Sequence, residues 1–193
     1  MTYNDAWQEK CWVTITEKGA SGTKHHFRAY TRDISIKYGA KDGEGVATLS
    51  GGRIWKYTPE GDSEVTMSVY AIKGVDDPKG PQLFAGNTTD TSDPIQVTNS
   101  ITRKDVRLTI LWSQNAPASN EADGVPTTGG MRRVFFKNAR VTNYEEDFST
   151  DEVLKGSITV KVPPYDASGN GSITWESTED IATNALSAMG DYT

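Results

Sequence analysis

Apolar and polar residues alternate along most of this 193-residue chain, in short segments separated by glycine, proline and polar residues. A period of two places successive side chains on opposite faces of a β-strand, so each alternating segment predicts a half-buried strand. Eight segments show the pattern: residues 11–16, 27–38, 52–57, 65–72, 106–112, 131–144, 158–162 and 172–176. Eight short strands are enough for a β-sandwich or a barrel.

Helical spacing is confined to two short segments. Over residues 178–189, Ser177 can cap the first turn, Ile181 and Met189 belong to one apolar stripe, and Gly190 ends the pattern. A shorter helical turn is expected over residues 81–85. The predicted fold class is therefore mainly β, a sandwich or barrel with one or two short flanking helices.

Three stretches have neither period and are predicted to be long loops: residues 39–52, 87–105 and 113–130. Loops of this length are uncommon inside compact domains, and they are usually functional or become ordered on contact. We expect residues 1–193 to form a single domain. Its N-terminal arm would cover about residues 1–10, and its C-terminal helix or arm about residues 178–193.

The composition supports a β protein, because 13 Val, 11 Ile and 23 Thr stand against 6 Leu. A single cysteine excludes an internal disulfide and gives no zinc cluster. The first 20 residues show no signal peptide, and no run of about 18 apolar residues predicts a membrane span. A net charge of −6 argues against a surface that binds the phosphates of a nucleic acid. A soluble protein made in the cytoplasm is expected.

The side chains that could carry catalysis have simpler interpretations. His25 and His26 are adjacent, so they point to opposite sides of a strand, and we expect them to be solvated at a strand end. Cys11 alternates with apolar residues and is expected to be a small buried hydrophobe. We therefore predict no enzyme, no catalytic residue, no cofactor and no metal.

Three weaker patterns leave alternatives open. Asp166, Ser168 and Asn170 resemble the first half of a calcium loop, but Ser177 occupies the place of the closing glutamate, so a polar hairpin turn is favoured. Acidic residues at 145–147 and 151–152 are expected to be a solvated charge run rather than a glycosidase pair. The five tryptophans are expected mostly in the core rather than on a carbohydrate-binding platform.

Two long stretches resemble major tail tube proteins of long-tailed, siphovirus-like viruses. The first is GGRIWKYTPEGDSEVTMSVYAIKG, residues 51–74, and the second is VFFKNARVTNYEEDFSTDEVLKGSITVKVPPYDASGNGSITWES, residues 134–177. In that family a Gly-Gly turn leads into a strand and a T-P-E segment, and an F-K-N-A strand is followed by an acidic bend and a V-P-P-[FY]-D strand. The resemblance covers residues 34–177 and includes no catalytic motif.

The resemblance implies a structural virion protein whose rings, hexameric in the family, stack into the tube through which genome DNA passes without specific binding. It implies self-association, contact with other tail proteins at the tube ends, and assembly in the host cytoplasm. The strands around 27–38 and 52–72 would line the inner wall, and the 39–52 loop would contact the next ring. The expected inter-ring contact residues are Lys41, Asp42, Glu44, Val46 and Leu49.

Two rival interpretations are retained. One is the inner tube of a contractile tail or injection device, which is also a structural protein. The other, from a different class, is a carbohydrate-binding β-sandwich module.

Overall fold

The computed structural model describes residues 10–20, 22, 24–28, 34–70, 84, 105–147 and 155–193. Nearly all regular structure in this part of the chain is β, and every strand pairing is antiparallel, which confirms the predicted mainly β class. The strands are β1 (Lys10–Glu17), β2 (Lys24–Arg28), β3 (Ser35–Lys37), β4 (Gly43–Ala47), β5 (Arg53–Tyr57), β6 (Ser63–Tyr70), β7 (Val106–Ser113), β8 (Met131–Asp147), β9 (Lys155–Val162) and β10 (Ile173–Thr178).

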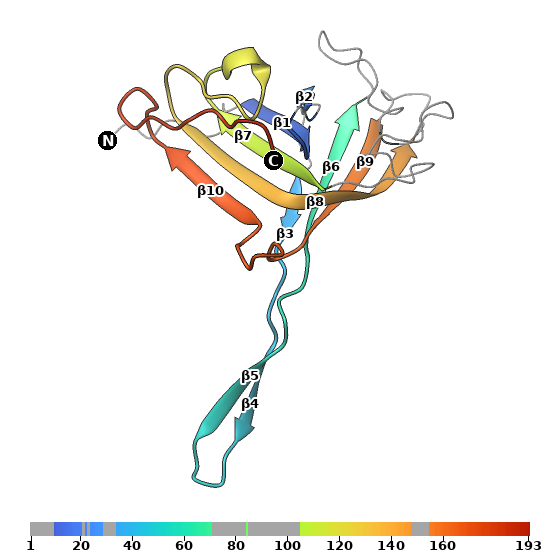
Figure 1. Cartoon of the computed structure of the whole chain (residues 1–193), viewed down its shortest axis with the longest axis vertical. Helices are drawn as coiled ribbons and strands as arrows, with labels where there is room; N and C mark the ends of the chain where they lie inside the picture. Colours follow the sequence, from blue (N-terminus) through green and yellow to red (C-terminus); the bar gives the residue numbers. More distant parts are fainter. Residues whose placement is uncertain are drawn as a thin grey trace.

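One eight-stranded sheet forms the body, in the order β2-β1-β7-β8-β9-β6-β3, with β10 also paired to β8. The 17-residue strand β8 belongs to both halves: its first part pairs with β7 and β10, and its second part pairs with β9. Figure 1 shows β8 curving across the body, with β1 and β7 above one part of it, β6 and β9 above the other part, and β10 below it. The body is therefore sandwich-like, and the long strand β8 connects its two halves.

The two halves share one apolar core. Alternate residues of each strand point into it, such as Val13 opposite Ile110 in one half and Val65 opposite Val160 in the other. All four side chains are at most 1% exposed. Burying a side chain of this size stabilises the fold by about 1.5–3 kcal/mol. Phe84, described apart from its neighbours, is also fully buried in this core.

A second, smaller cluster lies on the other face of the β1–β7–β8 half. Trp12, Leu111 and Met131 pack there against Ala122 of the 113–130 segment and Ile181 of the C-terminal segment. The 113–130 segment, here called the cover, is a loop as the sequence predicted, with one short 3-10 helix, η2 (Ala118–Asn120), and it packs on the sheet. No helix in the described part of the chain is long and apolar enough to span a membrane.

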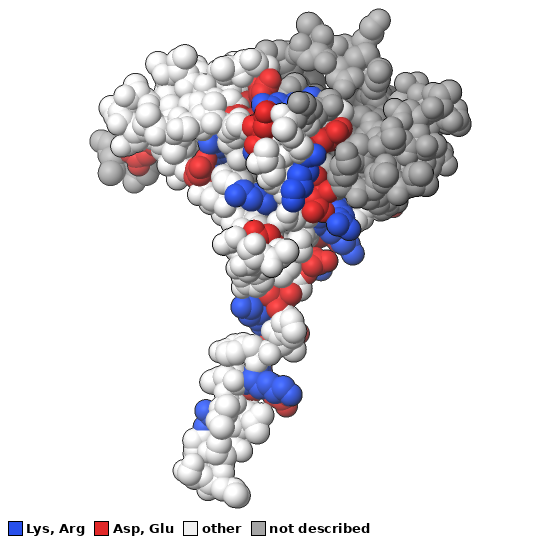
Figure 2. All heavy atoms as spheres, in the orientation of Figure 1, with Lys and Arg blue, Asp and Glu red and all other residues white. Residues whose placement is uncertain are grey.

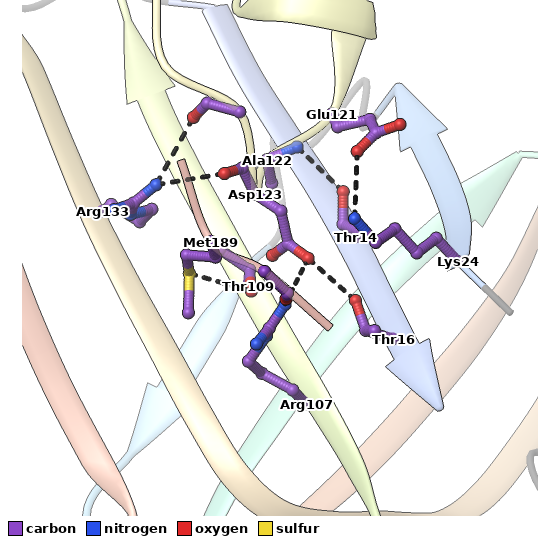
Figure 3. A network of polar contacts seen from close by, with 12 residues as sticks. Thr14, Thr16, Lys24, Arg107, Thr109, Glu121, Ala122, Asp123, Arg133 and Met189 are labelled. Carbon is purple, nitrogen blue, oxygen red and sulfur yellow. Dashed lines mark hydrogen bonds and ion pairs between the residues drawn. The ribbon is translucent and has the colours of Figure 1, made fainter. Parts of the chain in front are cut away.

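Buried polar contacts between the cover and the strands beneath it hold the cover against the sheet (Figure 3). Arg107 and Thr16 both bond the carboxylate of Asp123, at 2.7 and 2.9 Å, and Thr14 accepts the N–H of Ala122 at 2.8 Å. Arg133, 1% exposed, donates to main-chain carbonyls of the cover and pairs with Glu176 on β10. The Arg107–Asp123 bond does most to hold the cover on the sheet, because breaking it would leave a buried charge unpaired.

The predicted helix over residues 178–189 is wrong. Ser177 lies within β10 and cannot cap a helix. The main-chain carbonyl of Asp180 accepts from the N–H groups of Thr183 and Asn184, which makes a single helical turn, and no helix follows it. Residues 185–190 have no regular secondary structure, and the carbonyls of Ser187 and Gly190 accept from the buried side chains of Arg133 and Arg107. The predicted turn over 81–85 lies outside the described residues except for Phe84.

Two predicted segments divide differently in the structure. The 27–38 run overlaps β2 and β3, with residues 29–33 between them not described. The predicted 39–52 loop contains β4 and forms half of a hairpin with β5. Strand β5 therefore lies outside the body sheet, whereas β6, in the same sequence motif, lies within it.

Candidate functional site

The candidate catalytic and metal-binding residues form no reactive cluster in the described part of the chain. His25 is buried, and its Nε2 lies 2.8 Å from Oε1 of Glu17, so the prediction that it is solvated is wrong. The other ring, His26, lies outside the described side chains. Cys11 is half-buried against the core, and the described residues include no group of three or more His, Cys, Asp or Glu that could hold a metal ion.

Residues 166–171 form a hydrogen-bonded turn, the interpretation favoured from the sequence. Both carboxylate oxygens of Asp166 accept bonds from within the turn: Oδ1 from the N–H groups of Ser168 and Asn170, and Oδ2 from the Asn170 side chain. These bonds from Asn170 lower the pKa of Asp166 below its usual value. The Asp166 carboxylate therefore closes the turn through hydrogen bonds within residues 166–170.

The described tryptophans do not form a flat sugar-binding platform. Trp12 is buried, and Trp55 lies on a separate hairpin. Trp112 and Trp175 stack with ring centroids 6.3 Å apart, and the guanidinium of Arg132 lies 4.4 Å from the Trp175 ring centre. The Trp112 and Arg132 side chains thus occupy positions against the ring that a stacked sugar would need.

The most distinctive surface is the hairpin of β4 and β5, here called the arm (residues 43–57). Figure 1 shows it projecting far from the body on two extended segments. It forms its own two-stranded sheet, and all ten strand residues are exposed. A lone two-stranded hairpin is only marginally stable in water, so an arm of this kind needs contacts along its length.

One face of the arm is aromatic. Trp55 and Tyr57 stack with their ring centres 6.5 Å apart, and they are 57% and 62% exposed. They lie directly opposite Gly45 and Gly43. A Cβ on Gly43 would lie 3.0 Å from the Tyr57 ring, so glycine allows the ring to lie flat over the facing strand. The pairing gives this face a smooth aromatic surface.

The opposite face is aliphatic and charged. Val46 and Ile54 are a cross-strand pair, 48% and 64% exposed, and Glu44 lies opposite Lys56 beside them. Leu49 lies at the tip and is fully exposed. The arm therefore presents large apolar side chains on both faces and at its end. Exposed apolar patches of this kind mark surfaces that become covered by another molecule.

The turn at the tip is closed by local hydrogen bonds. Thr48 bonds the carbonyl of Gly52 through both its N–H and its hydroxyl, at 2.8 and 3.0 Å, and the N–H of Gly51 donates to Thr48. Gly51 has a φ of +82°, which favours glycine. Residues 47–52 carry no charge, and the arm's tip is correspondingly white in Figure 2.

Two extended segments, residues 38–42 and 58–62, form a stalk that connects the arm to the body. Asp42 and Thr58 exchange backbone and side-chain bonds at 2.9 Å, and Gly61 donates to Ala40 at 3.3 Å. A Cβ on Gly39 would overlap the carbonyl of Gly61, so the segments approach too closely for any other residue there. The stalk is thus a continuous, narrow extension of β3 and β6.

The five residues predicted as contacts all lie on the arm or its stalk. Glu44, Val46 and Leu49 are on the arm, whereas Lys41 and Asp42 are on the stalk. Leu49 projects from the turn, and Val46 from the aliphatic face. The sequence prediction places Ile54, Trp55 and Tyr57 on an inner-wall strand. The structure pairs that strand, β5, with β4, so Ile54 lies opposite Val46 on one face of the arm and Trp55 and Tyr57 lie on the other face.

Comparisons with known proteins add the following. No family model and no curated protein matches the chain. It is similar to a chain of an extracellular contractile injection system, the PVC sheath–tube complex in its extended state, at 12% identity over 86% of this chain and 88% of that one, with a TM-score of 0.48. It is also similar to the SPP1 tail tube, at 11% identity over 91% and 80% of the two chains, with a TM-score of 0.46. Hcp1 from Flavobacterium johnsoniae matches at 12% identity over 86% and 98%, with a TM-score of 0.33. Because these TM-scores lie below 0.5, we argue function from the chain's own surface.

Proposed function

We propose that this chain is a structural subunit that associates with copies of itself to build a tube, the tail tube of a virus or of a related particle. The observation that carries the proposal is the arm. It is an isolated hairpin with apolar side chains on both faces and at its tip, held away from the body where only another molecule can cover it.

A contact between an arm on one copy and a different surface on the next is heterologous. Such contacts repeat, and they produce either closed rings or continuous filaments. An arm that is apolar on both faces fits between two surfaces, so we propose that each arm inserts between subunits of the adjoining ring. Lys41, Asp42, Glu44, Val46 and Leu49 then lie at or beside the contact, together with Ile54, Trp55 and Tyr57 from β5.

The finer features follow from the sequence resemblance and are part of the same proposal. The rings are hexameric, the tube belongs to the tail of a siphovirus-like virion assembled in the host cytoplasm, and other tail proteins cap its ends. Genome DNA passes through the lumen without specific binding. A net charge of −6 suits such a conduit, because phosphates bind to surfaces rich in lysine and arginine. The face visible in Figure 2 has both signs of charge interspersed on the body.

The inner tube of a contractile tail or injection device uses the same self-association, so it is the alternative within this class. Electron microscopy of the purified full-length chain, across a range of concentrations, tests the common proposal. Rings or tubes with a central channel are the expected result. A chain that stays monomeric at high concentration and binds glycans would instead identify the carbohydrate-binding module.

A further inference from the structure

The turn between β9 and β10 reaches the stalk of the arm, and Tyr165 makes the contact. Pro163 and Pro164 follow the last residue of β9, and neither has an N–H to continue the ladder. The chain therefore leaves the sheet here, next to the root of the stalk. The Tyr165 side chain is 47% exposed, so its position is not set by burial in the core.

The turn that carries Tyr165 is internally fixed. Asp166 donates its N–H to the carbonyl of Asn170 at 2.9 Å, and its carboxylate accepts the N–H groups of Ser168 and Asn170 at 2.8 Å each. Behind it, the N–H of Ser172 donates to the carbonyl of Pro164 at 3.0 Å. Tyr165 thus projects from a closed loop whose geometry is set by its own hydrogen bonds.

The hydroxyl of Tyr165 joins both segments of the stalk. It donates to Oε2 of Glu60 at 3.1 Å and accepts from Nζ of Lys41 at 3.4 Å. Lys41 and Glu60 are themselves an ion pair at 3.5 Å, and the Lys41 ammonium lies 5.8 Å from the centre of the Tyr165 ring. The hydrogen bond to Tyr165 raises the pKa of Lys41 above its usual value.

We propose that Tyr165 is a positioning residue that fixes the direction of the arm relative to the body. The backbone bonds of the stalk join its two segments to each other, for example Thr58 to Asp42, and one further bond joins the Gly39 N–H to Oγ of Ser63, the first residue of β6. The Tyr165 contact is different, because it connects both segments to a turn of the body sheet. An arm held in one direction loses less conformational freedom when it binds, and this consequence alone rests on the proposed function.

The direct test measures the direction of the arm in dilute, unassembled protein. Spin labels are placed on Leu49→Cys at the tip and on Ser177→Cys in β10, in a Cys11→Ala background, and the distance distribution is recorded by double electron–electron resonance. Tyr165→Phe removes only the hydroxyl and should widen the distribution. Glu60→Gln removes the carboxylate charge and should widen it in the same sense. Circular dichroism should show all variants folded.

Tyr38→Phe is the matched control. Tyr38 lies at the root of the stalk and is 48% exposed, and its hydroxyl has no hydrogen-bond partner recorded within the described part of the chain. The Tyr38→Phe variant should leave the distance distribution between the two spin labels unchanged. A Tyr165→Phe distribution as narrow as that of the unmodified chain, or equal widening in Tyr38→Phe, would overturn the proposal.

Tube growth provides a second measurement. Tyr165→Phe should slow elongation by about two- to fivefold, the range expected for losing one exposed polar contact, without changing the final tube. If no variant and no unmodified chain ever forms tubes, the proposed function fails. The resonance result still decides whether Tyr165 directs the arm.

Discussion

Replacing the aliphatic pair of the arm should separate assembly from folding. In Val46→Thr/Ile54→Thr both new residues are β-branched, so the hairpin keeps its strand propensity while it loses apolar surface. The two native side chains are 48% and 64% exposed, so about half of each remains to be buried by a neighbour. At about 1.5–3 kcal/mol for a fully buried side chain of this size, the pair should contribute about 2–3 kcal/mol per subunit to the proposed tube formation.

That loss predicts a critical concentration for tube formation about 30- to 150-fold above that of the unmodified chain. Pelleting assays over a concentration series, with electron microscopy of the pellets, measure it. The free energy of unfolding of the dilute protein should change by no more than about 0.5 kcal/mol, because both positions are on the exposed arm. Ala185→Ser/Ala188→Ser makes comparable apolar-to-polar changes at exposed positions of the C-terminal segment and should leave assembly unchanged. A critical concentration within twofold of the unmodified value would refute the assigned role of this face.

Three further results are expected. Asp123→Asn leaves the buried Arg107 without its countercharge and should lower the free energy of unfolding by about 3–5 kcal/mol, seen as a lower urea midpoint at constant slope; a loss below about 1 kcal/mol would contradict the buried pairing. Gly39→Ala places a methyl group against the facing stalk segment, so amide exchange along the arm should accelerate while that of the core strands does not; unchanged exchange would show that the stalk tolerates the wider spacing. Because the pKa of Asp166 is lowered, its contribution to the turn is complete above the ordinary value of 3.8 and is lost as the pH falls through the lowered one; the Ser168 amide resonance should therefore shift below pH 3.8, and a midpoint at or above that value would be the contrary result.

The strands of the body sheet could be predicted from the sequence wherever apolar and polar side chains alternate along them. The run around Val13 alternates buried apolar and polar residues, and it is paired in the structure as a strand of the sheet. The helix over 178–189 was mispredicted for a tertiary reason. Its apolar residues Ile181 and Leu186 do pack on the sheet, but most of the segment is irregular and is connected to the buried side chains of Arg107 and Arg133 through the carbonyls of Gly190 and Ser187.

Only one strand of the arm could be predicted from the sequence: β5 was predicted as a strand, and β4 was predicted as part of a loop. Its first strand contains Gly43 and Gly45, which have no side chains to display a period of two, so the segment was predicted to be a loop. The predicted residues Val46 and Leu49 did identify the exposed apolar segment. The aromatic face was not predictable, because Trp55 has the same alternation as a core residue and only its pairing with a glycine strand places it on the surface.

The distance along the sequence between paired strands differs between the arm and the body sheet, and this difference predicts the order in which they form. The arm pairs residues within a 15-residue segment, and hairpins of this kind form in about 1–10 μs. In the body, Glu17 pairs with Val106, so β1 must wait until a distant part of the chain arrives. The arm, only marginally stable by itself, can therefore form transiently and expose its apolar side chains before the sheet that carries it is complete. Refolding at high concentration should consequently trap misassembled chains, and the yield of competent subunits should rise with dilution.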